Sequence, residues 1–234
     1  MKKIMIFMFA LLGVATANAQ DTVEGSVSAD IVSRYIWRGQ PMADASIQPS
    51  AGLSYKGLSL SAWGDYSFLN TKDTKEFDLT LAYSTGGFNI GITDYWFSYY
   101  GADNAYFEYR AHDTSHVWEA NIGYDFGPLA IQWYTNFAGA DGVNNSGKRA
   151  YSSYCELSAP FKLATCDWTA IVGFVPYATT FYADADGFAV TNVSLKASKE
   201  VSVCGKFAPS LYIQGIANPS TKKGYLVIGA SFGI

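Results

Sequence analysis

Charged residues and histidines are scarce in this 234-residue sequence, and no long apolar run follows residue 14. Asp, Glu, Lys and Arg make up only 15% of the chain, below the ~25% of ordinary soluble domains. A helix that spans a membrane needs ~20 consecutive apolar residues, and no segment has them. Aromatic side chains, by contrast, reach 16%. Few charges and many aromatics are expected when half of every strand faces lipid.

Cysteine is also rare, with Cys155, Cys166 and Cys204 in the whole chain. An odd number leaves at least one thiol unpaired within the chain. Cys155 and Cys166 flank an expected turn at Pro160-Phe161 symmetrically, so we expect them to face each other across a hairpin. They form either a disulfide, in an oxidising compartment, or two small apolar side chains facing lipid. Cross-strand geometry suits S–S bonds poorly, which favours the second interpretation.

The first 19 residues have the features of a cleaved signal peptide. Lys2 and Lys3 form a positive start, residues 4–14 an apolar run, and Ala17-Asn18-Ala19 a cleavage site, with no cysteine after it to carry a lipoprotein anchor. Residues 20–234 are expected to form one exported domain. The signal holds two of the 16 basic residues and none of the 20 acidic ones, so that domain has a net charge of −6, which argues against nucleic acid as a partner.

Residues 23–39 alternate between apolar and polar side chains. Because neighbours in a strand point to opposite faces, one face carries Ile31, Tyr35 and Trp37, and the other is polar and charged. The stretch is longer than the usual ~5–6 residues of a strand, and aromatic residues gather at membrane–water interfaces. We therefore expect a transmembrane strand over 23–37, with lipid outside and water inside. Residues 225–234 alternate in the same way and are expected to close a barrel against it.

Short and long connections alternate along the rest of the chain without exception. Bacterial outer-membrane barrels have an even number of strands, short periplasmic turns and longer extracellular loops, whereas a Greek-key sandwich has no reason to sort its connections in this way. Residues 105–110 are assigned to the longest loop, because a thirteenth strand would break the alternation. The expected fold is all-β, an antiparallel up-and-down transmembrane β-barrel of 12 strands. The strands are expected at 23–37, 46–55, 58–68, 76–84, 88–98, 116–126, 129–137, 150–159, 164–176, 188–198, 204–217 and 225–234.

The inward positions of these strands carry more acids than bases. An unpaired ion in a dry interior costs many kcal/mol, so the excess of acids predicts water inside. Arg34 and Arg38 are expected to form an eyelet that faces four acids on three other strands. Asp94 departs from the pattern because it falls on the outward face, where a bulge or an early exit from the membrane would accommodate it. The expected pore-lining residues are Arg34, Arg38, Asp65, Glu76, Asp78, Glu119, Glu156, Asp167, Lys196 and Lys206.

Two interpretations of this interior stay open. A narrow channel would pass small hydrophilic solutes passively, with a mild cation preference that weakens at high salt. An interior closed by ion pairs and by large side chains such as Trp63 and Tyr95 would instead make a non-conducting structural or adhesive barrel. Barrels of about eight strands are filled by side chains, and those of about 16–18 leave an aqueous channel. Twelve strands lie between the two, and we favour the channel.

The segment Ser33-Arg34-Tyr35-Ile36-Trp37-Arg38-Gly39 resembles the opening motif of the TorF-like porins, a family of bacterial outer-membrane proteins. Further points of similarity are Gln48-Pro49-Ser50, the hairpin Tyr124-Asp125-Phe126-Gly127-Pro128-Leu129 and a hydrophobic final strand. The resemblance implies an outer-membrane barrel with a transport role, and it carries no substrate or binding residues. The terminal Ile234 departs from the Phe that ends many outer-membrane proteins, and Phe232 would serve in its place.

An outer-membrane lipid hydrolase is the alternative of a different class. Its Ser/His pair would be Ser98 and His116, which both face outward near the extracellular ends of their strands. No acid or amide that would orient the histidine is obvious. We therefore expect no enzyme. Asp184-Ala185-Asp186-Gly187 resembles the start of a calcium loop, yet its twelfth position is Leu195 rather than Glu. We expect no metal and no cofactor. The expected partners are outer-membrane lipid, lipopolysaccharide and small hydrophilic solutes, and the oligomeric state stays open.

Overall fold

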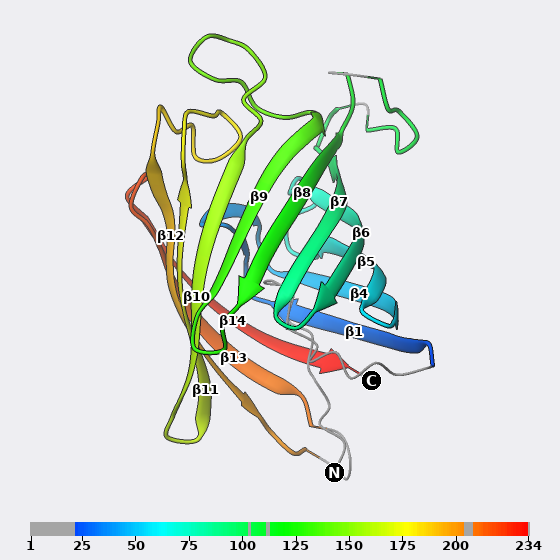
Figure 1. Cartoon of the computed structure of the whole chain (residues 1–234), viewed down its shortest axis with the longest axis vertical. Helices are drawn as coiled ribbons and strands as arrows, with labels where there is room; N and C mark the ends of the chain where they lie inside the picture. Colours follow the sequence, from blue (N-terminus) through cyan, green and yellow to red (C-terminus); the bar gives the residue numbers. More distant parts are fainter. Residues whose placement is uncertain (1–21, 103, 111–112, 204–207, 234) are drawn as a thin grey trace.

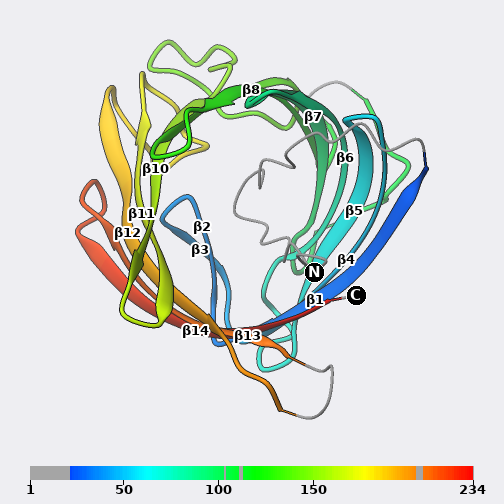
Figure 2. The ribbon, with the colours of Figure 1, turned by 60° about the horizontal axis from the view of Figure 1, so that its bottom comes forward.

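The computed structural model describes residues 22–102, 104–110, 113–203 and 208–233, which form a closed antiparallel β-barrel of twelve strands. Figure 1 shows the barrel from the side and Figure 2 from one end. The predicted fold class and strand number are confirmed. The barrel strands are β1 (Glu24–Val32), β4 (Ser46–Tyr55), β5 (Leu58–Ser67), β6 (Lys75–Thr85), β7 (Phe88–Ser98), β8 (His116–Asp125), β9 (Ala130–Gly139), β10 (Ser153–Leu163), β11 (Cys166–Val175), β12 (Ala189–Glu200), β13 (Ser210–Asn218) and β14 (Lys223–Gly233).

The barrel closes because β1 pairs with β14, and each strand between pairs with its neighbours in sequence. The expected signal peptide lies outside the described residues. Within the described ranges, no helix is long and apolar enough to cross a membrane.

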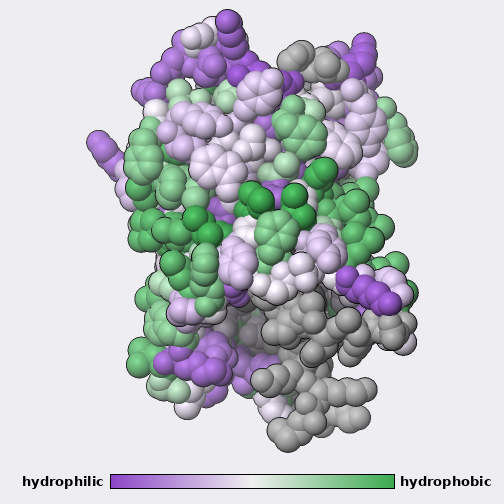
Figure 3. Space-filling view, viewed as in Figure 1, coloured by the Kyte–Doolittle hydropathy of each residue, from purple (hydrophilic) through white to green (hydrophobic). Residues whose placement is uncertain are grey.

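The two faces of the barrel wall differ as the alternation predicts. Leu81 and Ile122 point outward and are 52% and 48% exposed, whereas Asp78 and Glu119 point inward and are 9% and 2% exposed. Figure 3 shows hydrophobic side chains across the middle of one side and hydrophilic ones gathered at its upper end. Apolar side chains therefore cover most of the outer wall, and acids such as Asp78 and Glu119 line the interior.

The connections at the two ends of the barrel differ in length. One end of the barrel, here called the loop end, carries residues 33–45, 68–74, 99–115, 140–152, 176–188 and 219–222. Its connections 99–115, 140–152 and 176–188 lie at the top of Figure 1. The opposite end, here called the turn end, has tight turns such as Lys56-Gly57 and Gly86-Gly87. The predicted alternation has one exception, the connection 201–209 at the turn end, because β12 extends to Glu200 and β13 begins only at Ser210 rather than at 204. Residues 105–110 form no strand, as predicted.

The hairpin β10–β11 turns four residues later than predicted. Pro160 to Leu163, expected to form the turn, belong to β10, and the turn is at Ala164-Thr165. Proline lacks a backbone N–H and is tolerated where a strand has a free edge; the pairing of β10 with β9 ends at Ser158, so Pro160 lies on such an edge. The shift also separates the two cysteines. Cys155 pairs with Phe174 and Cys166 with Leu163, both thiols are free, and the expected facing pair is wrong.

The first barrel strand is shorter than predicted, and this changes the interior. β1 ends at Val32, and the chain turns inward to form a small hairpin of β2 (Tyr35–Trp37) and β3 (Gln40–Ala43). Figure 2 shows this hairpin, here called the inward hairpin, inside the ring of strands. Tyr35 and Trp37, expected on the lipid face, are half-buried inside the barrel. The prediction of one strand over 23–37 is wrong.

The inward hairpin turns at Arg38 and Gly39, which have φ angles of 51° and 81°. Positive φ at both central residues is the geometry of a type I′ turn, which matches the twist of the flanking strands. Gly39 is required for a second reason: a Cβ atom there would lie 1.8 Å from the carbonyl oxygen of Thr191 on β12. The tip of the hairpin is therefore pressed against the far wall of the barrel.

Candidate functional site: the barrel lumen

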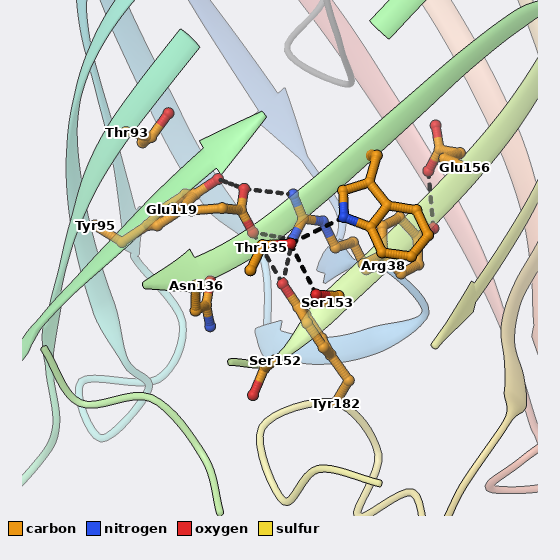
Figure 4. A network of polar contacts seen from close by, with 12 residues as sticks. Arg38, Thr93, Tyr95, Glu119, Thr135, Asn136, Ser152, Ser153, Glu156 and Tyr182 are labelled. Carbon is orange, nitrogen blue, oxygen red and sulfur yellow. Dashed lines mark hydrogen bonds and ion pairs between the residues drawn. The ribbon is translucent and has the colours of Figure 1, made fainter. Parts of the chain in front are cut away.

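The tip of the inward hairpin carries Arg38 across the lumen to Glu119 on β8. The guanidinium makes two hydrogen bonds to the carboxylate, with Nη1–Oε2 and Nη2–Oε1 distances of 2.5 and 2.8 Å. The Arg38 and Glu119 side chains are 7% and 2% exposed. Two-point pairing of this kind fixes the orientation of both groups. We call this ion pair the latch, and Figure 4 shows it from close by.

Two tyrosines complete the hydrogen bonds of the latch. The hydroxyl of Tyr182, in the loop 176–188, accepts a hydrogen bond from Arg38 and donates one of 3.0 Å to Glu119. Tyr95 on β7 donates a second hydroxyl bond, of 2.8 Å, to Glu119. Burial raises the pKa of the Tyr182 hydroxyl well above its usual range, an effect that Arg38 opposes and Glu119 reinforces. The phenol therefore stays protonated and continues to donate.

Aromatic rings enclose the Arg38 guanidinium. Its Cζ lies 4.1 Å from the ring centroid of Tyr134, 4.5 Å from that of Trp37 and 4.8 Å from that of Tyr154. A cation held over ring faces is attracted by their negative electrostatic surface, and the attraction grows when water is excluded. The Arg38 cation is thus balanced by one carboxylate and several aromatic faces, and this side of the lumen is closely packed.

Three more carboxylates lie beside the inward hairpin on the strands next to Tyr95, Asp65 on β5 and Glu76 and Asp78 on β6. They are 3%, 4% and 9% exposed. Asp65 and Glu76 are directly opposite each other across the β5–β6 pair, and Asp78 follows two residues along the same face. Asp65 accepts a hydrogen bond of 2.8 Å from Gln48. We call these three residues the acid wall.

The structure separates the remaining predicted lining residues. Glu156 on β10 is buried and accepts a 2.8 Å bond from the Tyr154 hydroxyl. Lys196 on β12 lies 3.5 Å from the centroid of the Tyr212 ring. Asp167 is exposed at the turn end and forms a 2.8 Å ion pair with Lys162. Lys206 lies outside the described residues.

Arg34 and Arg38 were expected to form one basic wall, and they lie in different environments. Arg34 is nearly half-exposed and forms an ion pair of 3.2 Å with Asp44 in the same connection. Only Arg38 crosses to the acids of the far wall. Tyr182 and Trp37 were not predicted as partners of Arg38. One signal was present: Ile36 is apolar at a position that the alternation assigns to the polar face, which indicates that the alternation ends before Trp37.

The neutral polar side chains of the lumen pair with one another toward the turn end. Thr80 and Thr93 share a hydrogen bond of 3.0 Å, and Gln214 donates one of 3.1 Å to Ser194. Among the described residues no group of three or more His, Cys, Asp or Glu side chains is arranged to hold a metal ion. The lumen therefore offers separate charged groups and hydroxyl groups to a solute.

A buried contact between a carboxylate and an imidazole lies on the outer wall near the loop end. Asp94 keeps its outward direction without a bulge in its pairing with β6 and β8, and its carboxylate lies 2.8 Å from Nδ1 of His116. The other ring nitrogen, Nε2, lies 2.6 Å from the carbonyl oxygen of Tyr106 and must donate to it. Tyr109 stacks on the imidazole at 4.2 Å. The long loop covers Asp94, which explains how an acid occupies an outward position.

Comparisons with known proteins identify remote structural likenesses. No family model and no curated protein sequence matches this chain. A structure from a study of in-meso crystallization of membrane proteins is 7% identical, with a TM-score of 0.49 over 90% of this chain and 83% of the other. The outer membrane protein opdK from Pseudomonas aeruginosa is 12% identical, with a TM-score of 0.38 over 89% of this chain and 61% of its own. OmpF of Salmonella typhi, in complex with daunomycin, is 10% identical, with a TM-score of 0.37 over 93% of this chain and 99% of its own. This chain thus spans about three fifths of the length of opdK.

Proposed function

We propose that this chain is a bacterial outer-membrane β-barrel that acts as a narrow passive channel for small hydrophilic solutes, with a mild preference for cations. The observation that carries the proposal is the sorting of side chains across the barrel wall. Exposed leucines and isoleucines cover the outside, and carboxylates, amides and hydroxyls line the inside. This sorting suits a barrel with lipid around it and water along its axis.

The membrane in the proposal is the outer membrane, reached by Sec-dependent export. The signal-like first 19 residues support export, and in a closed barrel each strand pairs with two neighbours, which satisfies backbone groups in lipid. Lipid and lipopolysaccharide are then the proposed partners of the outer wall and of the loop end. Exposed aromatics of the long loop, among them Tyr100 and Phe107, suit a membrane–water interface.

The cation preference follows from the charges that face the lumen. The acid wall and Glu156 have no basic partner in the ion pairs of the described residues, whereas Arg38 is neutralised by Glu119. A field of one sign in a narrow pore raises the local concentration of the opposite ion. Screening by salt reduces this effect, so the preference is expected to fall as the ionic strength rises.

The main rival is a non-conducting barrel. The latch favours it, because Arg38 joins the inward hairpin to the far wall and aromatic rings fill the space around it. In that case the chain would serve as a structural or adhesive barrel. The two functions differ in one property that can be measured directly, which is the current that the protein carries.

A lipid hydrolase finds partial support in the Asp94–His116 pair, because Asp94 is the orienting acid that the sequence did not reveal. The pair nevertheless lacks a free base. Nε2, the nitrogen that would take a proton from a nucleophile, already donates to the carbonyl oxygen of Tyr106. We therefore propose that His116 fastens the long loop to the barrel. Hydrolysis of phospholipid by the purified protein, lost on His116→Ala, would contradict this assignment.

Reconstitution in a planar bilayer tests the proposed function. With KCl at different concentrations on the two sides, a cation-preferring channel gives a reversal potential of the sign set by K⁺. We expect a small current with that sign, and a reversal potential that approaches zero as both salt concentrations rise. The absence of current at any voltage would favour the non-conducting barrel, and the opposite sign would show that the acid wall does not govern selection.

A further inference from the structure

We propose that the acid wall is a binding site for the guanidinium group of a solute. The inference rests on the proposed function, because a solute must enter the lumen to reach the site, and it goes further by naming the class of solute. It is carried by buried carboxylate oxygens that have no partner and by the rings that flank them.

The carboxylates of the acid wall are buried and incompletely satisfied. Among the described residues, no hydrogen-bond partner is found for either oxygen of Glu76, for Oδ2 of Asp65 or for Oδ1 of Asp78. Buried polar atoms in folded proteins almost always have a partner, in the protein or in a bound species. Glu76 is 4% exposed. The Tyr35 hydroxyl lies near its carboxylate, but neither oxygen has a hydrogen bond of ordinary geometry, so Glu76 points to a missing donor.

The positions of the acids add electrostatic repulsion. Asp65 and Glu76 are directly opposite in the β5–β6 register, which places their Cβ atoms about 4.5–5.5 Å apart. Like charges in this arrangement destabilise a sheet. The described ion pairs supply no counter-charge, since Arg38 pairs with Glu119 and Arg34 with Asp44. A cation from outside the chain would remove the repulsion and fill the vacant acceptors together.

The latch shows how this lumen holds a guanidinium. Arg38 is bound by a carboxylate and by the faces of Trp37, Tyr134 and Tyr154. The acid wall repeats these elements on the neighbouring strands. Asp78 is paired in register with Trp63 on one neighbouring strand and with Tyr95 on the other. Tyr35 of the hairpin packs edge-on against Trp63, with the ring centroids 5.4 Å apart. Carboxylates next to aromatic rings suit an organic cation.

The arrangement suits an organic cation better than a metal ion. No metal-holding group of acids is found among the described residues. Glu76 and Asp78 are two residues apart on one face, which corresponds to about 6–7 Å along a strand. A planar guanidinium presents five N–H donors in a fixed fork and can bridge separated carboxylates, whereas a metal ion needs its ligands converging on one point.

The solute approaches from the turn end. Because β6 begins at Lys75 at the loop end, Asp78 lies nearer the turn end than Glu76, and it keeps the largest exposed fraction of the three acids. The next inward residue of β6 after Asp78 is Thr80, bonded to Thr93, so the lining next to the acid wall on these two strands is neutral and polar. A cation entering from that side meets Asp78 first and Glu76 next.

Calorimetric titration of the full chain, folded in detergent micelles at low salt, tests the site. The probes are arginine and citrulline, which differ in having a guanidinium or a neutral urea group. The test variant is D65N/E76Q/D78N, which keeps the shape of the wall and removes its charge. The control is Glu24→Gln, which removes one negative charge at an exposed position at the end of the lumen.

We expect arginine to bind the natural protein and the Glu24→Gln variant alike, and to bind the triple variant at least about tenfold more weakly, a difference of ~1.4 kcal/mol. Citrulline should bind none of them measurably. Equal binding of arginine to the triple variant, equal binding of citrulline, or equal competition by K⁺ at the concentration of arginine would each overturn the proposal. A thermal melt of the triple variant in the same micelles checks that it is folded.

This experiment separates the site from the channel. Binding in micelles does not require a conducting pore, so binding without current in the planar bilayer would overturn the channel and keep the site. Current without arginine binding would overturn the site and keep the channel.

Discussion

The latch and the acid wall are two regions of the lumen that hold buried carboxylates differently. In the latch, Glu119 has a guanidinium, two tyrosine hydroxyls and no vacant position. In the acid wall, Glu76 is similarly buried, and neither of its oxygens has a hydrogen bond of ordinary geometry. A buried carboxylate that is fully bonded holds a structure in place, and a buried carboxylate that lacks partners is poised for an external one. Burial alone therefore does not distinguish a structural acid from a binding acid in this lumen.

The largest expected loss of stability comes from breaking the latch. Glu119→Ala leaves the Arg38 cation buried without its carboxylate, and removing one partner of a buried ion pair costs about 3–5 kcal/mol. We expect a loss of that size in the free energy of unfolding, measured by urea titration in lipid. The double variant R38M/E119L, which removes both charges and keeps the volume, should recover most of it. A loss of under about 1 kcal/mol, the range of exposed ion pairs, would show that the latch is not a buried pair.

Gly39→Ala disturbs the turn of the inward hairpin that carries Arg38. The residue has a φ of 81°, and an added Cβ would lie 1.8 Å from the Thr191 carbonyl oxygen. A left-handed conformation costs an L-residue about 1–2 kcal/mol, and the clash adds to it. We expect a loss of at least about 2 kcal/mol in the free energy of unfolding. Gly127→Ala, at a turn with a positive φ and nothing within 4 Å of the added Cβ, is the matched control and should cost less.

Tyr182→Phe removes one hydroxyl from the latch and keeps its ring. Glu119 loses a donor and Arg38 loses an acceptor, and hydrogen bonds to charged groups are worth about 1.5–3 kcal/mol. We expect a loss near the lower end of that range in the free energy of unfolding, because Tyr95 still donates to Glu119. Tyr177→Phe, which removes a hydroxyl outside the latch, provides the comparison. Equal losses for the two variants would mean that the Tyr182 hydroxyl has no special role.

Glu76→Gln is expected to raise the free energy of unfolding, whereas the latch variants lower it. It removes one of two like charges that face each other across β5 and β6, and such pairs are unfavourable by roughly 0.2–1 kcal/mol. The free energy of unfolding should rise by about that amount at low salt and less at high salt. A decrease in stability would mean that the carboxylate of Glu76 already has a partner in the free protein.

The smallest effect is expected at Arg34. Its ion pair with Asp44 is nearly half-exposed on both sides, and exposed pairs contribute about 0–1 kcal/mol. Arg34→Ala should change the free energy of unfolding by less than about 0.5 kcal/mol. A loss as large as that of Glu119→Ala would mean that Arg34 reaches into the lumen.

The sequence predicts the wall of this barrel better than its contents. Period-two alternation assigns Leu81 and Ile122 to the outside and Asp78 and Glu119 to the inside, because a strand has only two faces. It does not reveal which inward residues meet across the lumen, since those partners come from strands far apart in the chain. Glu119 was placed correctly on its face, yet its partner Arg38 arrives by a hairpin that the alternation of residues 23–37 conceals.

The errors in the prediction have local physical causes. The turn was expected at Pro160 because proline has no backbone N–H to donate to a neighbouring strand. At Pro160 one edge of β10 is unpaired, so no hydrogen bond is lost there. Asp94 was an unexplained outward acid, because nothing in the sequence indicates that His116 and the long loop cover it. In both cases a neighbour distant in sequence decides the outcome.

Single-channel conductance of the natural protein and of Glu119→Ala, recorded in the same bilayer and salt, tests the central claim most directly. The claim is that a charged lumen conducts and that the latched hairpin keeps it narrow. The account predicts a small, steady conductance for the natural protein and a larger, fluctuating one for the variant, because the hairpin tip is no longer held to β8. Equal conductance, or no current from either protein, would contradict it.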